Sequence, residues 1–359
     1  MSRAAQVMRA IAARFLVASA FAIFVASGVS AAAQGVEAFY KGRTLNLIVG
    51  YGPGGGYDAY ARLVARHMGR YIPGQPNIVV QNMPGAGSLV ATNYLYRIAP
   101  KDGTVFGSFA RNMPLMGLFG RRQIVQFDPV RFTWLGSAAS FKDDAYLLVA
   151  RKTNAMTSVA DLRLKGGAPL VLGSTAEGAS SDLMPIVLRE LLGLNVKAIS
   201  GYTDSSQLFL AIDRGEIEGR MVGLSAIRSN RPEWLRPDGP MRILVAMGSK
   251  HRHPDFPEVP MAWELATGER ERKLVEAIEL PYLLSRPYAA PPGVPADRAR
   301  ALKHAFLAVH KDPQLLAEAQ KIGIDISPVG AAEVLAVIRR VAETPPDLFK
   351  MIERLIASH

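Results

Sequence analysis

Short apolar runs alternate along this chain with segments whose apolar residues recur every three or four positions. In the first half, the apolar runs predict strands at Leu45–Val49, Ile78–Gln81 and Val105–Phe109, and the helical spacing predicts helices at Ala59–Tyr71 and Leu89–Ile98. Strands that alternate with helices are typical of α/β proteins, in which helices connect parallel strands. The pattern therefore predicts an α/β fold with mostly parallel sheets.

A second series of alternating elements begins near Ser140. The predicted strands are Tyr146–Ala150, Leu170–Leu172, Lys197–Ile199 and Arg242–Met247. The predicted helices are Asp182–Leu192 and Ser205–Arg214, and the second of them is followed by a short segment at Glu218–Val222. Two proline-rich segments and three helices complete the chain, at His251–Pro260 and Pro287–Pro295 and at Ala296–Val309, Gln314–Lys321 and Ala331–Glu343. We predict a first lobe from residues 34–139, a second from 140–280 with its crossover between 248 and 282, and a return to the first over 281–359.

A glycine-rich turn follows the first predicted strand. It contains Gly54, Gly55, Gly56, Tyr57 and Asp58, and we expect Asp58 to cap the next helix. Such a turn directs unpaired backbone N–H groups and the positive end of a helix at whatever lies above the strand. The turn therefore favours a carboxylate or phosphate ligand.

Other turns at the ends of strands complete the predicted ligand site. The second strand is followed by Pro84, Gly85, Ala86 and Gly87, and the second lobe contributes Ser174, Thr175, Ser180, Tyr202 and Asp204. Small hydroxyl groups donate hydrogen bonds to a carboxylate without adding charge, and tyrosine rings can form an aromatic wall. Because ligands of open α/β sheets bind beyond the carboxyl ends of the strands, we expect the turns of the two lobes to face each other across a cleft.

The first 33 residues have the pattern of a secretory signal peptide. Arg3, Arg9 and Arg14 precede an apolar run at Phe15–Val29, and an A-x-A cleavage site ends at Ala33. We therefore predict export to the periplasm by the Sec route. The chain has no cysteine, which excludes disulfides, a lipoprotein anchor and thiolate chemistry. Its formal net charge of +11 favours anionic solutes, since no long run of lysine and arginine points to nucleic acid.

Patterns for nucleotide binding, hydrolysis and metal binding are weaker. Gly54–Ala59 satisfies a permissive G-x-G-x-x-A pattern, but no acid follows Asp58 before Asp102 to hold a ribose hydroxyl. The segment Gly223–Ile227 lacks the second glycine of a G-x-S-x-G elbow, and the H-x-H pair at His251 lies in a proline-rich loop. We therefore predict no cofactor, no metal and no enzymatic activity.

Six short motifs occur in order along the chain. They are a P-G-G-containing turn at Tyr51–Asp58, N-x-P-G-A-G at Asn82–Gly87, a D-G-T segment at Ala99–Thr104, a Gly/Ser turn at Gly173–Ser180, F-P-x-V-P at Phe256–Pro260 and A-P-P-G-V-P at Ala290–Pro295. Together they resemble the motifs of the periplasmic receptors of tripartite tricarboxylate transporters, the Bug family. Two departures fall in the predicted site. Tyr202-Thr203-Asp204 stands where the family usually has Y-K-G, so an acid replaces a base, and Tyr57 enlarges a position that is commonly small.

The resemblance implies a two-lobed class II periplasmic binding protein fold with a ligand cleft between the lobes. It implies that main-chain groups of the first two turns hold a ligand carboxylate while the second lobe supplies specificity. We expect a monomer that delivers a small organic acid (a di- or tricarboxylate, an aromatic carboxylate or, with Asp204 binding its amine, an acidic amino acid) to the permease subunits of a tripartite membrane transporter. A receptor that presents its ligand to a sensor kinase is the alternative. An enzyme with Ser225 or Ser174 as its nucleophile is a third.

Overall fold

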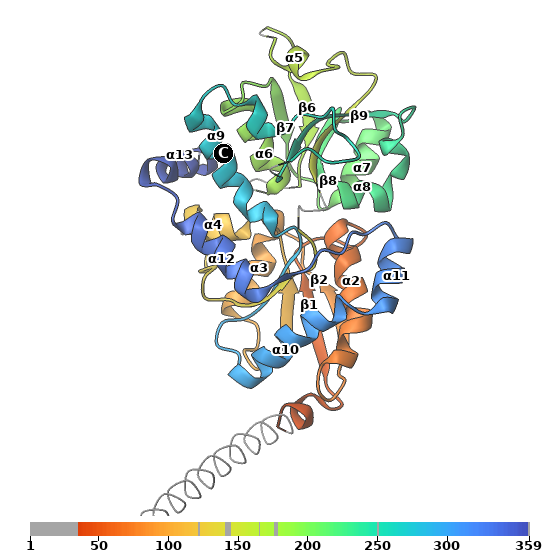
Figure 1. Ribbon diagram of the computed structural model, residues 1–359, viewed down its shortest axis with the longest axis vertical. Helices are drawn as coiled ribbons and strands as arrows, with labels where there is room; N and C mark the ends of the chain where they lie inside the picture. Colours follow the sequence, from red (N-terminus) through yellow and green to blue (C-terminus); the bar gives the residue numbers. More distant parts are fainter. Residues whose placement is uncertain are drawn as a thin grey trace, which may run out of the picture.

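The computed structural model describes residues 35–120, 123–140, 145–164, 166–175, 179–249 and 251–357. These residues form two lobes that lie one above the other along the long axis of the molecule (Figure 1). The predicted signal peptide and part of the Gly173–Ser180 motif, residues 176–178, lie outside the described residues. None of the helices in the described ranges is long and apolar enough to cross a membrane.

The first lobe is built on a six-stranded sheet with the order β11-β4-β10-β3-β1-β2. Its strands are β1 (Thr44–Val49), β2 (Asn77–Asn82), β3 (Val105–Ser108), β4 (Thr133–Ser137), β10 (Pro287–Ala290) and β11 (Val329–Gly330). The helices of this part of the chain are α2 (Gly56–Met68), α3 (Leu89–Arg97), α10 (Ala296–Val309), α11 (Pro313–Lys321) and α12 (Ala331–Ala342). Leu45, Leu47 and Val49 of β1 are fully buried, so this strand lies in the middle of the core.

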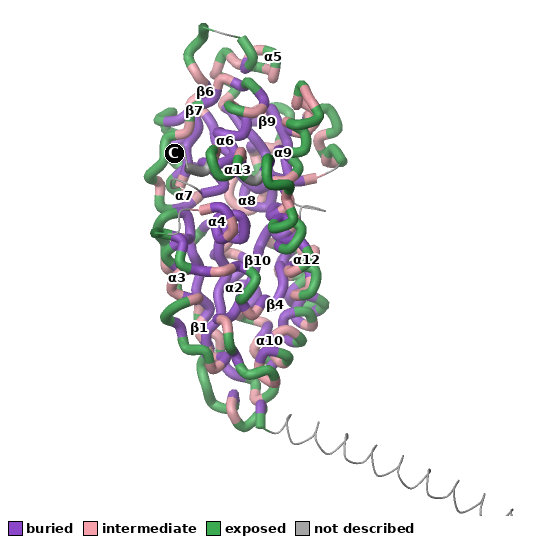
Figure 2. Tube along the Cα trace, turned by 90° about the vertical axis from the view of Figure 1, so that its left-hand side faces the viewer, coloured by how far each residue is buried: buried purple, intermediate pink, exposed green. Residues whose placement is uncertain are grey.

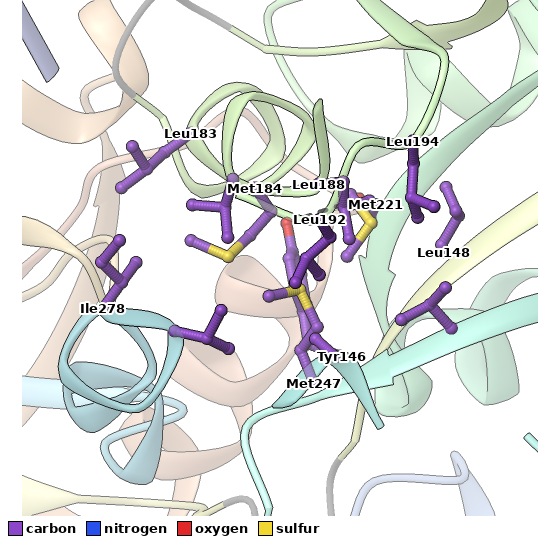
Figure 3. Close-up of a cluster of buried hydrophobic side chains, with 14 of the residues drawn as sticks. Tyr146, Leu148, Leu183, Met184, Leu188, Leu192, Leu194, Met221, Met247 and Ile278 are labelled. Atoms are coloured by element: carbon purple, nitrogen blue, oxygen red, sulfur yellow. Dashed lines mark hydrogen bonds between the residues drawn. The ribbon is translucent and has the colours of Figure 1, made fainter. Parts of the chain in front are cut away.

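The second lobe is built on a five-stranded sheet with the order β7-β6-β8-β5-β9. Its strands are β5 (Tyr146–Arg151), β6 (Leu170–Gly173), β7 (Val196–Ile199), β8 (Gly219–Gly223) and β9 (Met241–Met247). The helices are α5 (Val159–Leu162), α6 (Ser180–Glu190), α7 (Ser205–Arg214), α8 (Leu224–Asn230) and α9 (Glu269–Glu279). Figure 3 shows one core of this lobe, in which Leu148, Met184, Met221 and Met247 pack together.

Both sheets are mixed, so the prediction of mostly parallel sheets was wrong. β1 is parallel to β2 and β3, but β10 runs antiparallel to β3 and β4; in the second sheet β5 runs antiparallel to β8 and β9. These antiparallel pairings follow from the direction in which the chain enters each sheet. β5 and β10 each follow a segment from the other lobe, so they start at the cleft, where β1 and β8 end.

Several elements were absent from the predicted set. The structure adds the strands β4, β8, β10 and β11 and the helices α4 (Met113–Phe119), α5, α8, α9 and α13 (Pro346–Ala357). The helix at Ala331 was predicted to be the last, which is wrong, because α13 follows it. Leu348 and Ile352 of α13 belong to the same buried cluster as Met184 and Met221, so this helix packs on the core of the second sheet. The predicted residue boundaries of the lobes stay a prediction.

Buried positions run along the middle of both lobes and continue across the region where the lobes meet (Figure 2). Each lobe therefore has its own core, and the surface between the lobes is largely withdrawn from water. The candidate site lies in this region.

Candidate functional site

A small cavity lies between the two sheets, where β1 and β8 end and where α2, α6 and α7 begin. The volume that the centres of water-sized molecules can reach inside it is about 50 Å³. The first sheet and its connections contribute Tyr51, Gly55, Gly56, Tyr57, Arg111 and Arg286; the second contributes Tyr146, Thr175, Ser180, Ser181, Asp204, Ser205, Arg220, Val222, Gly223 and Ala226. The cavity is thus enclosed by residues of both lobes.

The lobes are in close contact around this cavity. A Cβ atom added to Gly52 would lie 2.6 Å from Oδ2 of Asp204, and one added to Gly54 would lie 3.1 Å from Oγ of Ser206. The glycines of the first turn therefore allow the backbone to approach the start of α7 to within a distance that a side chain would prevent. The structure shows a closed arrangement of the two lobes.

Three buried arginines line the cavity, and none of them was among the predicted site residues. Arg111, Arg220 and Arg286 expose only 3%, 3% and 1% of their surface. Arg111 follows β3, Arg286 comes directly before β10, and Arg220 lies on β8. Charged side chains are rarely buried to this extent without a functional or structural reason. They bring three guanidinium groups to the cavity wall.

Arg286 is held by serines and by aromatic rings. Its Nη1 donates to the carbonyl oxygen and the Oγ of Ser285, at 2.8 and 3.0 Å, and its Nη2 donates to Oγ of Ser225 at 2.8 Å. The guanidinium carbon lies 4.8 Å from the ring centre of Tyr57 and 4.9 Å from that of Tyr60. Cation–π contacts of this kind stabilise a cation that has left water.

Arg111 is positioned by Tyr57. The hydroxyl of Tyr57 accepts hydrogen bonds from the backbone N–H of Arg111 at 2.9 Å and from its Nε at 3.2 Å. The guanidinium also lies over the rings of Tyr146 and Tyr282, at 5.0 and 5.7 Å. Burial raises the pKa of Tyr146 to about 12, so this phenol is neutral at physiological pH.

Arg220 belongs to the other lobe. Its Nη1 donates to the carbonyl oxygen of Ser205 at 3.1 Å and its Nη2 to the Oγ of Ser205 at 3.0 Å, while its guanidinium lies 4.9 Å from the ring centre of Phe209. Burial lowers the pKa of Arg220 to about 10, which still leaves it positively charged at neutral pH. Arg220 therefore brings a permanent charge from the second sheet to the cavity.

Asp204 is the acidic residue among the described residues that line the cavity. Its Oδ1 accepts hydrogen bonds from the backbone N–H groups of Ser206 and Gln207, at 2.7 and 3.1 Å, and Oδ2 accepts one from Oγ1 of Thr203 at 3.1 Å. This pattern is that of a helix N-cap, in which the side chain satisfies the first free N–H groups of α7. The predicted role of Asp204 in binding a ligand amine stays a prediction.

Asp58 does not cap α2, contrary to the sequence prediction. The N-cap residue is Gly55, and Asp58 lies in the first turn of the helix. Its carboxylate accepts hydrogen bonds from the Gly54 N–H at 2.9 Å, from Arg62 Nε at 2.8 Å and from Asn82 Nδ2 at 2.9 Å. Burial acts to raise the pKa of Asp58, but these hydrogen bonds hold it below its usual value. Asp58 therefore fixes the glycine turn to the end of β2 and does not line the cavity.

The second predicted turn lines a neighbouring pocket. Pro84, Gly85, Ala86 and Gly87 lie there with Tyr202, around a space of about 270 Å³ that shares Tyr51 and Thr175 with the arginine cavity. Of the remaining predicted residues, Gly55, Gly56, Tyr57, Thr175, Ser180 and Asp204 line the arginine cavity. Gly54 is exposed, and Ser174 is fully buried behind the turn, where its Oγ lies 3.0 Å from that of Ser181.

The arrangement is suited to holding an anion. The beginnings of α2, α6 and α7 point to one cavity together with three guanidinium groups, and both features favour negative charge. Among the described residues there is no group of three or more His, Cys, Asp or Glu side chains that could hold a metal ion.

Fold and site together define a two-lobed solute-binding protein of the periplasmic binding protein class. The chain belongs to the tripartite tricarboxylate transporter receptor family, whose model matches residues 60–345. It is 24% identical over 290 residues to a UPF0065 protein of Bordetella pertussis, covering 80% of this chain and 82% of the relative. It is also 24% identical over 312 residues to a UPF0065 protein of a Pseudomonas species, covering 86% and 85% of the two chains. The resemblance drawn from the six motifs is thereby confirmed.

Solved structures of the same class show the same fold. The periplasmic binding protein BugD superposes with a TM-score of 0.67 at 19% identity, over 88% of this chain and 98% of its own. MatC of Rhodopseudomonas palustris with bound malate superposes with a TM-score of 0.64 at 18% identity, over 88% of this chain and 99% of its own. Another Rhodopseudomonas palustris protein, with adipate, superposes with a TM-score of 0.65 at 20% identity, over 88% of this chain and 98% of its own. The predicted two-lobed α/β fold is confirmed by these similarities.

Proposed function

We propose that this protein is a periplasmic receptor that captures a small carboxylate-bearing solute between its lobes and delivers it to a tripartite tricarboxylate-type membrane transporter. In this proposal it is exported with residues 1–33 as a Sec signal peptide, acts as a monomer and turns over no substrate. Membership of the receptor family supports the receptor role. The bound malate and adipate of two structural neighbours support a carboxylate as the ligand class.

The observation that carries the proposal is the cavity with three buried arginines. A guanidinium group donates two parallel hydrogen bonds to a carboxylate, and removal from water strengthens this charge-assisted pairing. Tyr51 and Tyr57 are stacked with their ring centres 4.8 Å apart on the cavity wall, which favours a ligand with a flat or apolar body. Di- and tricarboxylates, aromatic carboxylates and acidic amino acids are the candidates.

We propose that the ligand contacts Gly55, Gly56 and Tyr57 from the first lobe and Thr175, Ser180 and Asp204 from the second. The three arginines are added to this set. The turn that contains Pro84, Gly85, Ala86 and Gly87 lines the adjoining pocket, where a longer ligand extends past Tyr51.

A thermal-shift screen of the purified protein tests the ligand class. The panel contains mono-, di-, tri- and aromatic carboxylates and acidic amino acids. A ligand present at about 100 times its Kd adds about 2.7 kcal/mol to the unfolding free energy, which gives a clear rise in Tm. If no member of the panel raises Tm before or after the protein has been unfolded and refolded, to remove a co-purified ligand, the proposed ligand class is wrong.

Two variants of one glycine test the site. The backbone at Gly55 is extended (φ −80°, ψ 170°), and a Cβ atom there would make only an ordinary contact, 3.8 Å, with Ser205. Gly55→Asp places a negative charge in the first turn, and we expect it to lower the affinity for the ligand found in the screen by about 100-fold. Gly55→Asn has nearly the same shape without the charge and serves as the control. Equal losses in both variants would show that shape, not charge, is responsible and would argue against an anion at this turn.

Transport itself is tested in cells. Deletion of the gene should abolish uptake of the solute identified in the screen, and expression of the protein in the deleted strain should restore it. Normal uptake after deletion, combined with loss of a transcriptional response to the solute, would contradict delivery to a transporter.

A further inference from the structure

A second and larger cavity lies between α9 and the end of α12. The volume that the centres of water-sized molecules can reach inside it is about 640 Å³, and none of the described residues that line it also lines the arginine cavity. It is formed where the short helix η5 (Leu280–Leu283) packs against α12 and where α13 packs against α9 (Figure 1). This space is called the α9–α12 cavity below.

Part of the wall of the α9–α12 cavity is apolar. Leu280 and Leu283 of η5, Leu348 of α13 and the ring of Trp263 line it. The indole Nε1 of Trp263 donates a hydrogen bond to the carbonyl oxygen of Ser249 at 3.1 Å, which holds the ring in place. Sites for small molecules are lined mainly by apolar and aromatic side chains, with a few polar groups that orient the ligand. This wall therefore suits the apolar body of a small molecule.

Glu279 is the buried acid in the lining of this cavity. It is the last residue of α9 and is 7% exposed. The backbone N–H of Gly248 donates a hydrogen bond to its carboxyl group, but Oε1 has no hydrogen-bond partner among the described residues. The charge that acts on its pKa is that of Glu276, which is also negative. A buried acceptor without a donor is unfavourable, so a ligand that supplies a donor gains from this position.

The other charged side chains of the lining form an exposed rim. They are Arg272, Lys273 and Glu276 of α9, Arg340 of α12 and Glu343 directly after α12. Exposed charges are screened by water and salt, whereas a buried charge is screened much less. The rim also contains both signs, and Lys273 already pairs with Glu269 at 2.7 Å. The buried carboxyl group of Glu279 therefore has the largest influence on which charge the cavity binds.

We propose that the α9–α12 cavity is a second ligand site, which binds a small organic ammonium ion with an apolar chain. The ammonium group pairs with the carboxylate of Glu279, and the chain lies along Leu280, Leu283 and Leu348. An ammonium ion has three N–H donors and no acceptor, so it provides the donor that Oε1 lacks, in a charge-assisted hydrogen bond. This site does not depend on the receptor function proposed above, and it binds a ligand of the opposite charge.

Binding at this site should depend on pH, because Glu279 must ionise to pair with a cation. Burial raises the pKa of Glu279 to about 8. About one tenth of these carboxyl groups is then ionised at pH 7 and about nine tenths at pH 9, whereas an alkylammonium ion stays charged up to about pH 10. Exposed carboxylates and cations, such as those of the rim, titrate outside this range. We therefore expect the affinity for the cation to rise about tenfold from pH 7 to pH 9.

Titration with hexylamine, hexan-1-ol and hexanoate tests the ligand class, because these compounds share one chain and differ in charge. Binding is followed by ¹⁹F NMR of protein labelled with 5-fluorotryptophan, in which Trp263→Phe identifies the signal of Trp263. Trp134 and Trp234 do not line the cavity and serve as internal controls. At pH 9 we expect hexylamine to shift the Trp263 signal and to bind about tenfold more tightly than the other two compounds. Equal affinities of the three compounds, or no shift of the Trp263 signal, would overturn the proposal.

Glu279→Gln removes the charge and keeps the shape of the side chain. We expect the affinity for hexylamine at pH 9 to fall about tenfold or more and its pH dependence to disappear. Glu343→Gln is the matched control, because Glu343 lines the same cavity but is exposed; it should change the affinity less than about twofold. Hexylamine binding that survives Glu279→Gln, or equal losses in both variants, would overturn the site. If circular dichroism shows that Glu279→Gln does not fold, the pH dependence in the unaltered protein decides.

Lys250→Met tests whether a cation of the chain itself occupies the site. Lys250 follows Ser249 of the lining and lies outside the described residues. We expect hexylamine to bind this variant and the unaltered protein equally well. Binding by the variant alone would assign the carboxylate of Glu279 to Lys250 and overturn the ligand site. Each of these outcomes leaves the receptor function untouched, since the screen of carboxylates tests that function separately.

Discussion

Gly87 of the first lobe lies directly against Ala179 of the second. A Cβ atom on Gly87 would be 2.8 Å from the Cβ atom of Ala179 and 3.1 Å from its Cα atom. Both residues lie at the beginnings of helical segments, Gly87 before α3 and Ala179 as the N-cap of α6. The contact therefore brings two turns of opposite lobes together, and it exists because residue 87 has no side chain.

Gly87→Ala should hold the lobes apart. The added methyl group meets backbone as well as the side chain of Ala179, so it cannot be relieved by a rotamer change. Left-handed backbone at Gly87 (φ 59°) also costs alanine about 1 kcal/mol. We expect ligand affinity to fall about tenfold or more, because part of the binding energy must now distort this contact. Titration with the identified ligand and small-angle scattering measure the two effects.

Gly193→Ala is the control for backbone strain. Gly193 has nearly the same φ, 65°, but nothing lies within 4 Å of a Cβ atom added there. The two variants should therefore lose a similar free energy of unfolding, and only Gly87→Ala should lose affinity. Equal affinities of the two variants would show that this interlobe contact is not required for binding.

Local signals in the sequence were sufficient for many elements of the fold. The helices α7 and α10 have the bounds that the apolar spacing predicts. Asp204, directly before α7, is of a residue type that is favoured at the N-cap position. β10 was predicted as part of a proline-rich segment, because a four-residue strand with Pro287 inside it and Pro291 directly after it has no recognisable strand pattern. Its place between β3 and β4 depends on the chain returning from the other lobe, which no local pattern encodes.

The candidate site was predicted only in part for a related reason. Glycine turns and helix starts are local features, so Gly55, Gly56 and Ser180 could be found from the sequence. The arginines could not be ranked, because a buried arginine becomes distinctive only when the tyrosine rings that cover it are known. One signal was available: Arg220 lies in the short segment Glu218–Val222, directly before two apolar residues, and the structure shows this segment to be part of a buried strand.

Asp204→Asn should preserve the cap of α7 and strengthen anion binding. Asparagine caps helices about as well as aspartate, so the unfolding free energy should change by less than about 1 kcal/mol. The cavity gains one unit of positive charge, and we expect carboxylates to bind about two- to tenfold more tightly. Chemical denaturation and calorimetric titration measure these values. If an acidic amino acid binds and loses affinity in this variant, Asp204 holds its ammonium group and the expectation is wrong.

Tyr57→Phe should disturb Arg111 without removing its charge. The variant keeps the ring that faces Arg286 but loses the hydroxyl that accepts two hydrogen bonds from Arg111. A buried donor without its acceptor costs about 1–2 kcal/mol of stability. We expect ligand affinity to fall about three- to tenfold, because Arg111 is no longer held in one orientation.

Tyr60→Phe is the matched control for that loss. The Tyr60 hydroxyl donates to the carbonyl oxygen of Asp325 at 2.6 Å, and its ring also faces Arg286, but Tyr60 does not line the cavity. Tyr60→Phe should lower the free energy of unfolding by about as much as Tyr57→Phe does, and it should leave ligand affinity unchanged. A larger loss of affinity in Tyr60→Phe than in Tyr57→Phe would contradict the positioning role of Tyr57.

Glu279, the last residue of α9, is a buried acid that does not line the arginine cavity. Its side chain is 7% exposed, and among the described residues no hydrogen-bond partner reaches its Oε1. Burial raises the pKa of Glu279 to about 8, with a smaller contribution from the charge of Glu276, while the backbone N–H of Gly248 acts in the opposite direction. The folded protein therefore holds this proton at a pH where the unfolded chain has already released it.

Glu279→Gln should make the protein more stable at alkaline pH. Since the pKa is 4.5 in the unfolded chain and about 8 in the folded one, Glu279 lowers the unfolding free energy progressively as pH rises from about 5 to above 8. Glutamine cannot ionise, so the variant should gain roughly 1–3 kcal/mol over the unaltered protein at pH 9 and little at pH 5. Urea denaturation at both values measures the gain. Glu276→Gln, exposed on the same helix, removes only the smaller contribution of the Glu276 charge to the pKa of Glu279 and should show a much weaker trend of the same sign. A gain for Glu279→Gln that is equal at pH 5 and pH 9 would place the cause in packing instead of ionisation.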